Sequence, residues 1–125
     1  MTDQTKNILI IEDDRTMAIA LQDSITTSDI KVQIVSSGED GLVVTKQDQP
    51  DLIILDLILG QLTGVDVLEA IRKEGTWGSH VPIIVLSSIT HLDKIEEVKK
   101  LATRYISKSD FEMTKLTELI KLLLD

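Results

Sequence analysis

The residues from Pro50 to Gly64, Pro-Asp-Leu-Ile-Ile-Leu-Asp-Leu-Ile-Leu-Gly-Gln-Leu-Thr-Gly, decide the fold that we expect for this chain. The stretch opens with a turn residue, continues through the apolar run 52–55, and then places one carboxylate, Asp56, directly after that run. A short apolar run bounded by turn signals is typical of a strand that is buried on both faces of a parallel sheet. Burial of an unpaired carboxylate is costly, so we expect Asp56 to lie where the strand emerges or to have a partner. Ligands bind at the carboxyl ends of strands in open parallel sheets, which makes Asp56 the first candidate functional residue.

The composition indicates one globular domain, residues 1–125, with an aliphatic core. Hydrophobic residues make up 42% of the chain, which is too many for a disordered protein, and aromatic residues only 2%. The formal net charge of −8 argues against direct nucleic-acid partners and against binding to an anionic membrane surface. The absence of cysteine excludes disulfides and thiol chemistry. We find no signal-peptide pattern and no apolar run near the roughly 18 residues of a membrane span, so we expect a soluble, cytoplasmic protein.

Apolar runs and helical spacing predict five strands that alternate with five helices. The other strands are expected at 7–11, 31–35, 81–86 and 104–106, and the helices at 17–28, 39–47, 65–71, 92–102 and 111–123. We interpret residues 75–80 as a polar, glycine-rich turn, in which Trp77 is an exposed loop residue or a partner contact. The alternation implies right-handed crossovers and a parallel sheet with helices on both faces. The predicted fold class is therefore a doubly wound α/β three-layer sandwich.

Chemically active side chains follow four of the five expected strands. In chain order they are Glu12, Asp13, Asp56, Ser87 and Lys108. The carboxyl ends of parallel strands lie at one edge of a sheet, so we expect these side chains to meet in one crevice. Three close carboxylates repel each other and suit a Mg²⁺ ion, whereas a lysine and a hydroxyl suit phosphate oxygens. The set predicts phosphoryl transfer onto or past Asp56.

Each of these residues alone also has a purely structural interpretation. The run Glu12-Asp13-Asp14 can be a loop that leads into a helix N-cap, a position where acids are favoured. Asp56 can be a structural cap, Ser87 can bond to the backbone, and Lys108 can be solvated. The functional interpretation depends on all four strand ends carrying suitable groups at once.

Four segments of the chain together resemble the response-regulator receiver domain along nearly its whole length. The segments are Ile8-Leu9-Ile10-Ile11-Glu12-Asp13-Asp14, Pro50-Asp51-Leu52-Ile53-Ile54-Leu55-Asp56-Leu57 with Gly64, Pro82-Ile83-Ile84-Val85-Leu86-Ser87-Ser88, and Tyr105-Ile106-Ser107-Lys108. The resemblance implies the strand order 2-1-3-4-5. It also implies that Asp56 accepts a phosphoryl group from a phosphohistidine on a sensor histidine kinase or a phosphotransfer protein. Such a domain catalyses at most its own phosphorylation and dephosphorylation, so we do not expect an enzyme.

The resemblance further implies the roles of the residues around Asp56. Mg²⁺ would be held by Asp13, Asp56 and the backbone carbonyl of Ile58, with Glu12 acting through water. Ser87 and Lys108 would hold the phosphoryl oxygens. Tyr105 would be the ring that turns inward when Ser87 moves, and the output surface for a downstream protein would be the last helix–strand–helix face, residues 92–123.

The chain departs from the family pattern at several positions near this site. Gly60 stands where proline is usual, Thr63 where aspartate is usual, and Ser87 where threonine is commoner. Ser109 follows Lys108 where the family usually has proline, often after a cis bond. A cis bond before serine costs about 2.5–4 kcal/mol, so we expect a trans bond or a strained loop.

Two apolar residues, Ile58 and Ile89, stand where polar groups often flank the family's site. We hypothesise that they hinder the attacking water and make the phosphorylated state long-lived.

Three functions remain open from the sequence. The leading one is a phosphorylatable signalling switch, and the second is a receiver-like interaction module that is not phosphorylated and does not bind Mg²⁺. The third is a metal-dependent phosphatase with an aspartyl nucleophile. Such phosphatases typically carry a second acid two residues after the nucleophile, where this chain has Ile58, so we rank this function last.

Overall fold

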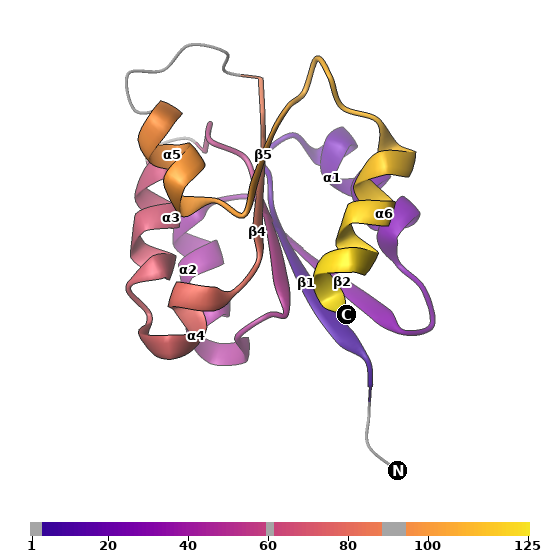
Figure 1. The fold of residues 1–125 in the computed structure, drawn as a ribbon, viewed down its shortest axis with the longest axis horizontal. Coiled ribbons are helices and arrows are strands. Elements are labelled where there is room, and N and C mark those ends of the chain that lie inside the picture. The colour runs from indigo at the N-terminus through magenta and orange to yellow at the C-terminus, as the bar shows by residue number, and fades with distance from the viewer. Residues whose placement is uncertain (1–3, 60–61, 89–94) are drawn as a thin grey trace.

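The computed structural model describes residues 4–59, 62–88 and 95–125, whose centre is a five-stranded parallel sheet (Figure 1). The strand order is β2-β1-β3-β4-β5, and every neighbouring pair is parallel. The strands are β1 (Lys6–Ile11), β2 (Ile30–Val35), β3 (Leu52–Leu55), β4 (Ile83–Ser87) and β5 (Arg104–Ser107). The predicted fold class and the strand order implied by the resemblance are both confirmed.

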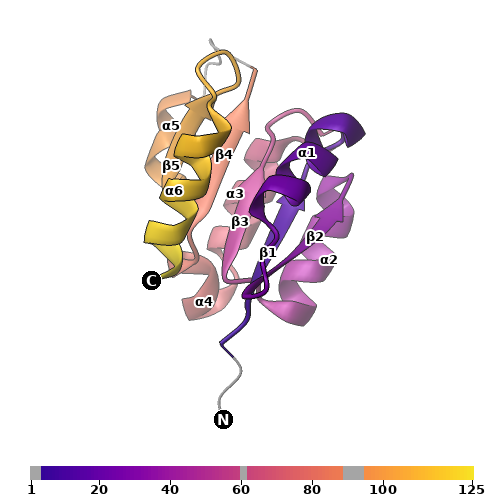
Figure 2. The ribbon, with the colours of Figure 1, turned by 90° about the vertical axis from the view of Figure 1, so that its right-hand side faces the viewer.

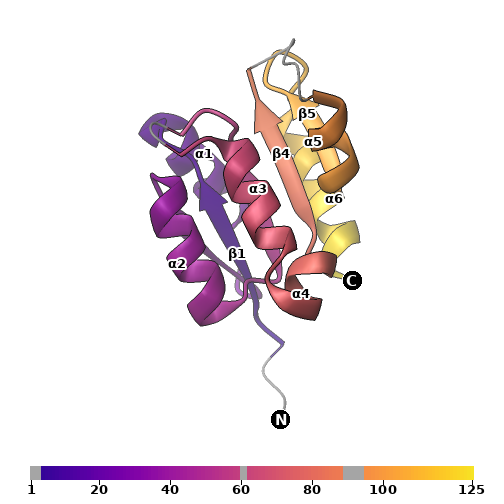
Figure 3. The same cartoon turned by 90° about the vertical axis from the view of Figure 1, so that its left-hand side faces the viewer.

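Helices cover both faces of the sheet. They are α1 (Arg15–Ile25), α2 (Gly38–Asp48), α3 (Gly64–Arg72), α4 (Gly75–His80), α5 (Ile95–Leu101) and α6 (Met113–Leu124). Helices α1 and α6 lie on one face (Figure 2), and α2, α3 and α5 lie on the other, with α4 below α3 (Figure 3). Within the described ranges, no helix is long and apolar enough to cross a membrane.

The two-residue period of the strands divides the core into two apolar layers. In β1, Leu9 and Ile11 face the layer with α2, α3 and α5, whereas Ile8 and Ile10 face the layer with α1 and α6. The four residues of β3 are all buried because both faces of this central strand are covered. A strand that is buried on both sides must be apolar throughout, which explains why the run 52–55 is continuous rather than alternating.

Side chains cap the starts of α1 and α3 on the site side of the sheet. Asp14 accepts a hydrogen bond from the backbone N–H of Met17, as expected for an acid at a helix N-cap. Thr63 accepts from the N–H of Asp66 at the start of α3, and its hydroxyl donates to the Asp66 carboxylate at 2.8 Å. Thr63 therefore fixes the start of α3.

The prediction of five helices was incomplete, because residues 75–80 form the short helix α4 and not a turn. Gly75 has a positive φ of 68°, which lets the chain leave α3 and start a new helix at once. A Cβ on Gly78 would overlap the backbone carbonyl oxygen of Ile71, so this glycine allows α4 to pack tightly against α3. Tertiary packing thus outweighs the low helix propensity of glycine.

The interpretation of Trp77 as an exposed loop residue was also wrong. Its side chain is half-buried against the core, and its indole N–H donates to the backbone carbonyl of Pro50 at 3.0 Å. The last helix begins at Met113 rather than at residue 111, and the predicted start of the fourth helix at Leu92 lies outside the described residues.

Arg72 joins three segments of the chain at the end of α3. Its Nε donates to the carbonyl of Leu101 at 2.8 Å, and its Nη1 donates to the carbonyls of Gly78 and Val81 at 3.0 and 2.7 Å. The guanidinium therefore links α3 to α4, to the start of β4 and to the end of α5. Burial lowers the pKa of Arg72, but arginine stays charged at any physiological pH.

We predict that Arg72→Leu lowers the free energy of unfolding by about 2–4 kcal/mol, because it leaves partly buried carbonyls without a donor. The control is Lys73→Leu, since Lys73 is the exposed neighbour and its replacement should change stability by less than about 0.5 kcal/mol. Urea unfolding measures both values. Equal losses in the two variants would contradict the role that we give to Arg72.

Candidate functional site

The parallel register places Glu12 beside Asp56. Ile11 pairs with Leu55 in β3 and with Val35 in β2, so the residues that follow β1 and β3 emerge together. The backbone N–H of Asp56 continues the ladder by donating to the carbonyl of Ile11 at 3.0 Å. Both carboxylates are buried, with 3% of Glu12 and 5% of Asp56 exposed. The sheet therefore holds two acids in a confined space at its carboxyl edge.

Asp13 adds a third, exposed carboxylate to this pair. Carboxylate oxygens of Glu12, Asp13 and Asp56 all lie within 4.8 Å of one another. Hard oxygen ligands at such spacing, with an open side toward solvent, are the donor set that Mg²⁺ takes when it keeps several waters. The residues present thus fit a divalent cation, because when all three are ionised the positive charge of Lys108, which pairs with Glu12 and Asp56, leaves two negative charges uncompensated.

Lys108 reaches this acidic group from the loop after β5. Its Nζ lies 2.8 Å from Oε1 of Glu12 and 3.4 Å from Oδ2 of Asp56, and its side chain is 23% exposed. Burial alone lowers the pKa of Lys108, but the hydrogen bonds and charges of Glu12 and Asp56 outweigh burial and raise it. Lys108 therefore stays a cation, and it partly neutralises the two buried acids.

The two buried acids also affect each other. The pKa of Glu12 is raised from 4.5 to about 7, first by burial of its carboxylate and then by the hydrogen bond and the charge of Asp56. Hydrogen bonds from Lys108 and from the backbone N–H of Asp14 act in the opposite direction without cancelling this effect. Without a metal ion, Glu12 thus carries a proton in a large part of the molecules at neutral pH.

Ser87 lies on β4, the strand next to β3, and Tyr105 lies on β5, the edge strand beyond it. Ser87 ends β4 and is completely buried, and its backbone carbonyl accepts from the N–H of Lys108 at 2.8 Å. Tyr105 of β5 pairs with Val85 of β4. Because side chains alternate along a strand, Tyr105, Val85 and Ser87 share one face of the sheet. The Tyr105 ring is half-buried, with Nζ of Lys99 5.8 Å from its centre.

The loop after Asp56 depends on Gly64 at the start of α3. Its backbone N–H donates to the carbonyl of Leu57 at 3.0 Å, and a Cβ there would overlap the Asp56 carbonyl oxygen and the Leu57 Cα. Ile58 points its side chain outward, 48% exposed, while its N–H donates to Oδ1 of Asp56 at 3.3 Å. Gly64 belongs to the motif quoted above, but the sequence does not explain why glycine is needed there. The close approach of Gly64 to the backbone of Asp56 and Leu57 leaves no pattern in the neighbouring residues.

The structure thus brings together Glu12, Asp13, Asp56 and Lys108, places Ser87 at the end of the adjacent strand, and leaves Tyr105 two residues before the end of β5. The bond between Lys108 and Ser109 is trans. A trans bond was one of the two alternatives that we expected, the other being a strained loop. Gly60 and Ile89 lie outside the described residues.

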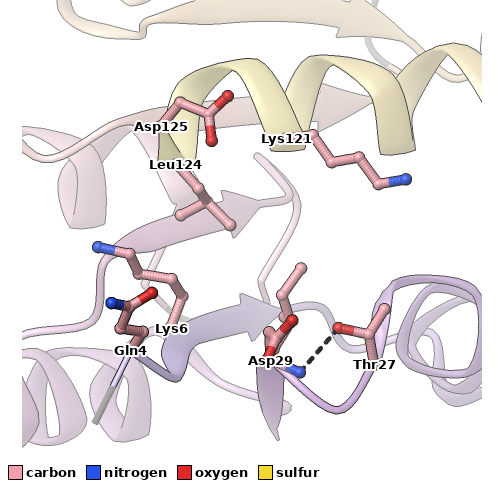
Figure 4. A pocket seen from close by; sticks show the side chains of 8 residues that line it. Gln4, Lys6, Thr27, Asp29, Lys121, Leu124 and Asp125 are labelled. Atoms are coloured by element: carbon pink, nitrogen blue, oxygen red, sulfur yellow. Dashed lines mark hydrogen bonds between the residues drawn. The ribbon is translucent and has the colours of Figure 1, made fainter. Parts of the chain in front are cut away.

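A separate hollow of about 730 Å³ lies at the opposite edge of the sheet, where β1 and β2 begin and α6 ends (Figure 4). Its lining includes two lysines, Lys6 and Lys121, and two aspartates, Asp29 and Asp125. These charges balance and do not converge on one point in the way that the acids around Asp56 do. The carboxyl edge of the sheet is therefore the better candidate site.

The fold and this edge define a doubly wound α/β domain with an acidic site that suits a cation and a phosphate. The family model of the response regulator receiver domain matches residues 8–121. The chain therefore belongs to the response regulator receiver domain family. The transcriptional regulatory protein AfsQ1 of Streptomyces coelicolor is 34% identical over 103 residues, which are 82% of this chain and 44% of AfsQ1. The chain thus spans less than half the length of that regulator.

Two solved structures resemble the whole sandwich. The phosphorylated cyanobacterial phytochrome response regulator RcpA has a TM-score of 0.79 and 28% identity, with 95% of this chain and 91% of that chain covered. The Mn²⁺-bound form of response regulator Rcp1 has a TM-score of 0.76 and 26% identity, with 95% and 89% covered.

We predict that, without metal, the thermal stability falls as the pH rises from about 5 through about 7, because the folded state holds a proton on Glu12 that the unfolded state releases more readily. The sign follows from the raised pKa of Glu12, which favours folding at the lower pH. Melting curves in a chelator measure the effect. In Glu12→Gln, which cannot ionise, this part of the pH dependence should disappear, and parallel curves for the two proteins would contradict it.

Proposed function

We propose that residues 1–125 form a single receiver domain that accepts a phosphoryl group on Asp56 and thereby switches a protein-interaction surface. The observation that carries the proposal is the meeting of Asp56, two further carboxylates and the Lys108 ammonium at the carboxyl edge of the sheet. A lone capping aspartate would need none of these neighbours. The family to which the chain belongs supports the same function.

Mg²⁺ is the cofactor that we propose, held by Asp13, Asp56 and the carbonyl of Ile58, with Glu12 acting through water. When bound, the ion neutralises charge on the acids and on the phosphoryl oxygens. The clustered carboxylates supply suitable ligands, and the Mn²⁺-bound structure of the related Rcp1 supports a divalent cation. Ionisation of Glu12 would accompany binding, because a neighbouring cation favours the charged form of a carboxylate.

Phosphoryl transfer needs little from the protein beyond positioning and charge. An oxygen of Asp56 attacks the phosphorus of a phosphohistidine, a P–O bond forms, and the P–N bond to the donor breaks. The Lys108 ammonium, now shared between Glu12 and Asp56, would turn to the new phosphoryl oxygens together with the Ser87 hydroxyl. The phosphorylated structure of the related RcpA supports an acceptor of this type.

The proposed switch starts at Ser87 and ends on the outer face. Tyr105 shares a sheet face with Ser87, so a shift of Ser87 toward the phosphoryl group would leave space for the ring to turn inward. The ring lies between the sheet and Lys99 of α5, and its movement would change the surface formed by α5, β5 and α6. A downstream protein would read that surface, and a sensor histidine kinase or a phosphotransfer protein would supply the phosphoryl group.

We predict that incubation with acetyl phosphate and Mg²⁺ adds the mass of one phosphoryl group to the intact protein, as measured by mass spectrometry. The gain should vanish in Asp56→Asn, which keeps the shape of the side chain but removes its nucleophilic charge. Omission of Mg²⁺ should also prevent it. A wild-type protein that takes up no phosphoryl group even from a histidine kinase would instead be the silent interaction module.

We predict that Ile58→Asn shortens the half-life of the phosphorylated protein, because the exposed apolar side chain two residues from Asp56 is the group that we expect to hinder the attacking water. Adding Ile89→Glu should shorten it further. Loss of the phosphoryl group over time, followed by intact mass, gives the half-lives. Ile19→Asn is the control, since Ile19 on α1 is 40% exposed and Ile58 is 48% exposed. A wild-type half-life no longer than that of the double variant would refute the hypothesis.

A further inference from the structure

Two serine hydroxyls flank Lys108, and the proposed phosphoryl transfer does not use them. The Oγ atoms of Ser107 and Ser109 lie 2.8 Å apart, and the backbone N–H of Ser109 donates to Oγ of Ser107 at 3.3 Å. Ser107 is the half-buried last residue of β5, and Ser109 is exposed. The hydroxyl of Ser107 thus closes a small turn around Lys108.

Two backbone hydrogen bonds complete this turn. The N–H of Lys108 donates to the carbonyl of Ser87 at 2.8 Å, and the N–H of Asp110 donates to the carbonyl of Ser107 at 3.0 Å. The first bond ties Lys108 to the end of β4, and the second bond starts the path toward α6. The backbone of Lys108 is therefore held from both sides, with its side chain directed across β4 to Glu12 and Asp56.

A restrained backbone at Lys108 favours its contacts with the site, because the lysine side chain is flexible. A four-carbon stem loses rotamer freedom when its ammonium is fixed, and a loose backbone would add to that loss. A proline after the lysine, as the family usually has, would restrict the backbone and offer no N–H. Here Ser109 has an N–H, and the Ser107 hydroxyl accepts its hydrogen bond.

We propose that the Ser107 hydroxyl, supported by Ser109, positions Lys108 for its contact with the phosphoryl oxygens. The inference rests on the proposed function, since the contact exists only if Asp56 is phosphorylated. Ser107 is a positioning residue that acts through Lys108, and it touches none of the three acids of the site. Its loss should therefore slow phosphorylation without changing the affinity for Mg²⁺.

A double-mutant cycle tests this dependence. We expect Ser107→Ala to lower the rate of phosphorylation by acetyl phosphate about three- to tenfold, the effect of one hydrogen bond on a barrier. In a Lys108→Ala background the same change should have no further effect, because the residue through which it acts is missing. Ser107→Thr keeps the hydroxyl and should restore the rate, and Ser109→Ala, which keeps the N–H, should lose less.

The control is Ser79→Ala, which removes a hydroxyl from α4 at the opposite edge of the sheet and should leave the rate unchanged. A Mg²⁺ titration followed by the melting temperature should give the same affinity for Ser107→Ala and wild type. Equal losses from Ser107→Ala with and without Lys108 would overturn the proposal, as would an unchanged rate.

A second measurement does not require phosphorylation. NMR relaxation of the Lys108 Cε methylene reports the order of this side chain on the ps–ns timescale. Its order should fall in Ser107→Ala and return in Ser107→Thr. If wild type takes up no phosphoryl group while this pattern holds, the proposed function fails and the positioning role stands. An order that does not change in Ser107→Ala overturns the positioning role whatever the phosphorylation result.

Discussion

The placement of two acids at the ends of neighbouring buried strands is the constraint on which the site depends. Glu12 and Asp56 are held together by the ladder between β1 and β3, so they cannot move apart to relieve their repulsion. Lys108 crosses from β5 to contact both. Burial of like charges is tolerated where a cation or a shared proton compensates, and this site has both. The charge balance of these three groups is therefore sensitive to any ligand that changes the local charge.

The same sheet connects this charged edge to the outer helices. The two apolar layers leave β3 without an exposed face, so Asp56 meets its polar neighbours at the strand ends and in the loops beyond them. Ser87 and Lys108 are joined through the backbone, and Tyr105 lies on the same face as Ser87. In the function that we propose, a new charge at Asp56 would act on groups that are already linked to β5.

Much of this arrangement was predictable because it follows from periodicity. The apolar runs placed Glu12, Asp56 and Lys108 just past strand ends, and the rule that parallel strands end at one edge brought them together. The helix α4 was not predictable, because its two glycines argue against a helix and its stability comes from packing on α3. The contacts of Arg72 with three carbonyls join chain segments in ways that no spacing rule reports.

Gly64 and Ile58 show how unevenly this site can change in evolution. Nearly every single-base change that alters the Gly64 residue adds a side chain where only backbone fits, against the carbonyl of Asp56 itself. Ile58, six residues earlier, has a side chain that is 48% exposed, so we expect substitutions there to disturb the fold much less. Mutations at Ile58 can thus change the solvent access of Asp56, while Gly64 keeps the backbone geometry of the loop after Asp56 constant. If Asp56 is phosphorylated as we propose, descendants of this chain would be expected to differ in the lifetime of the phosphorylated state before they differ in the geometry of the acceptor site.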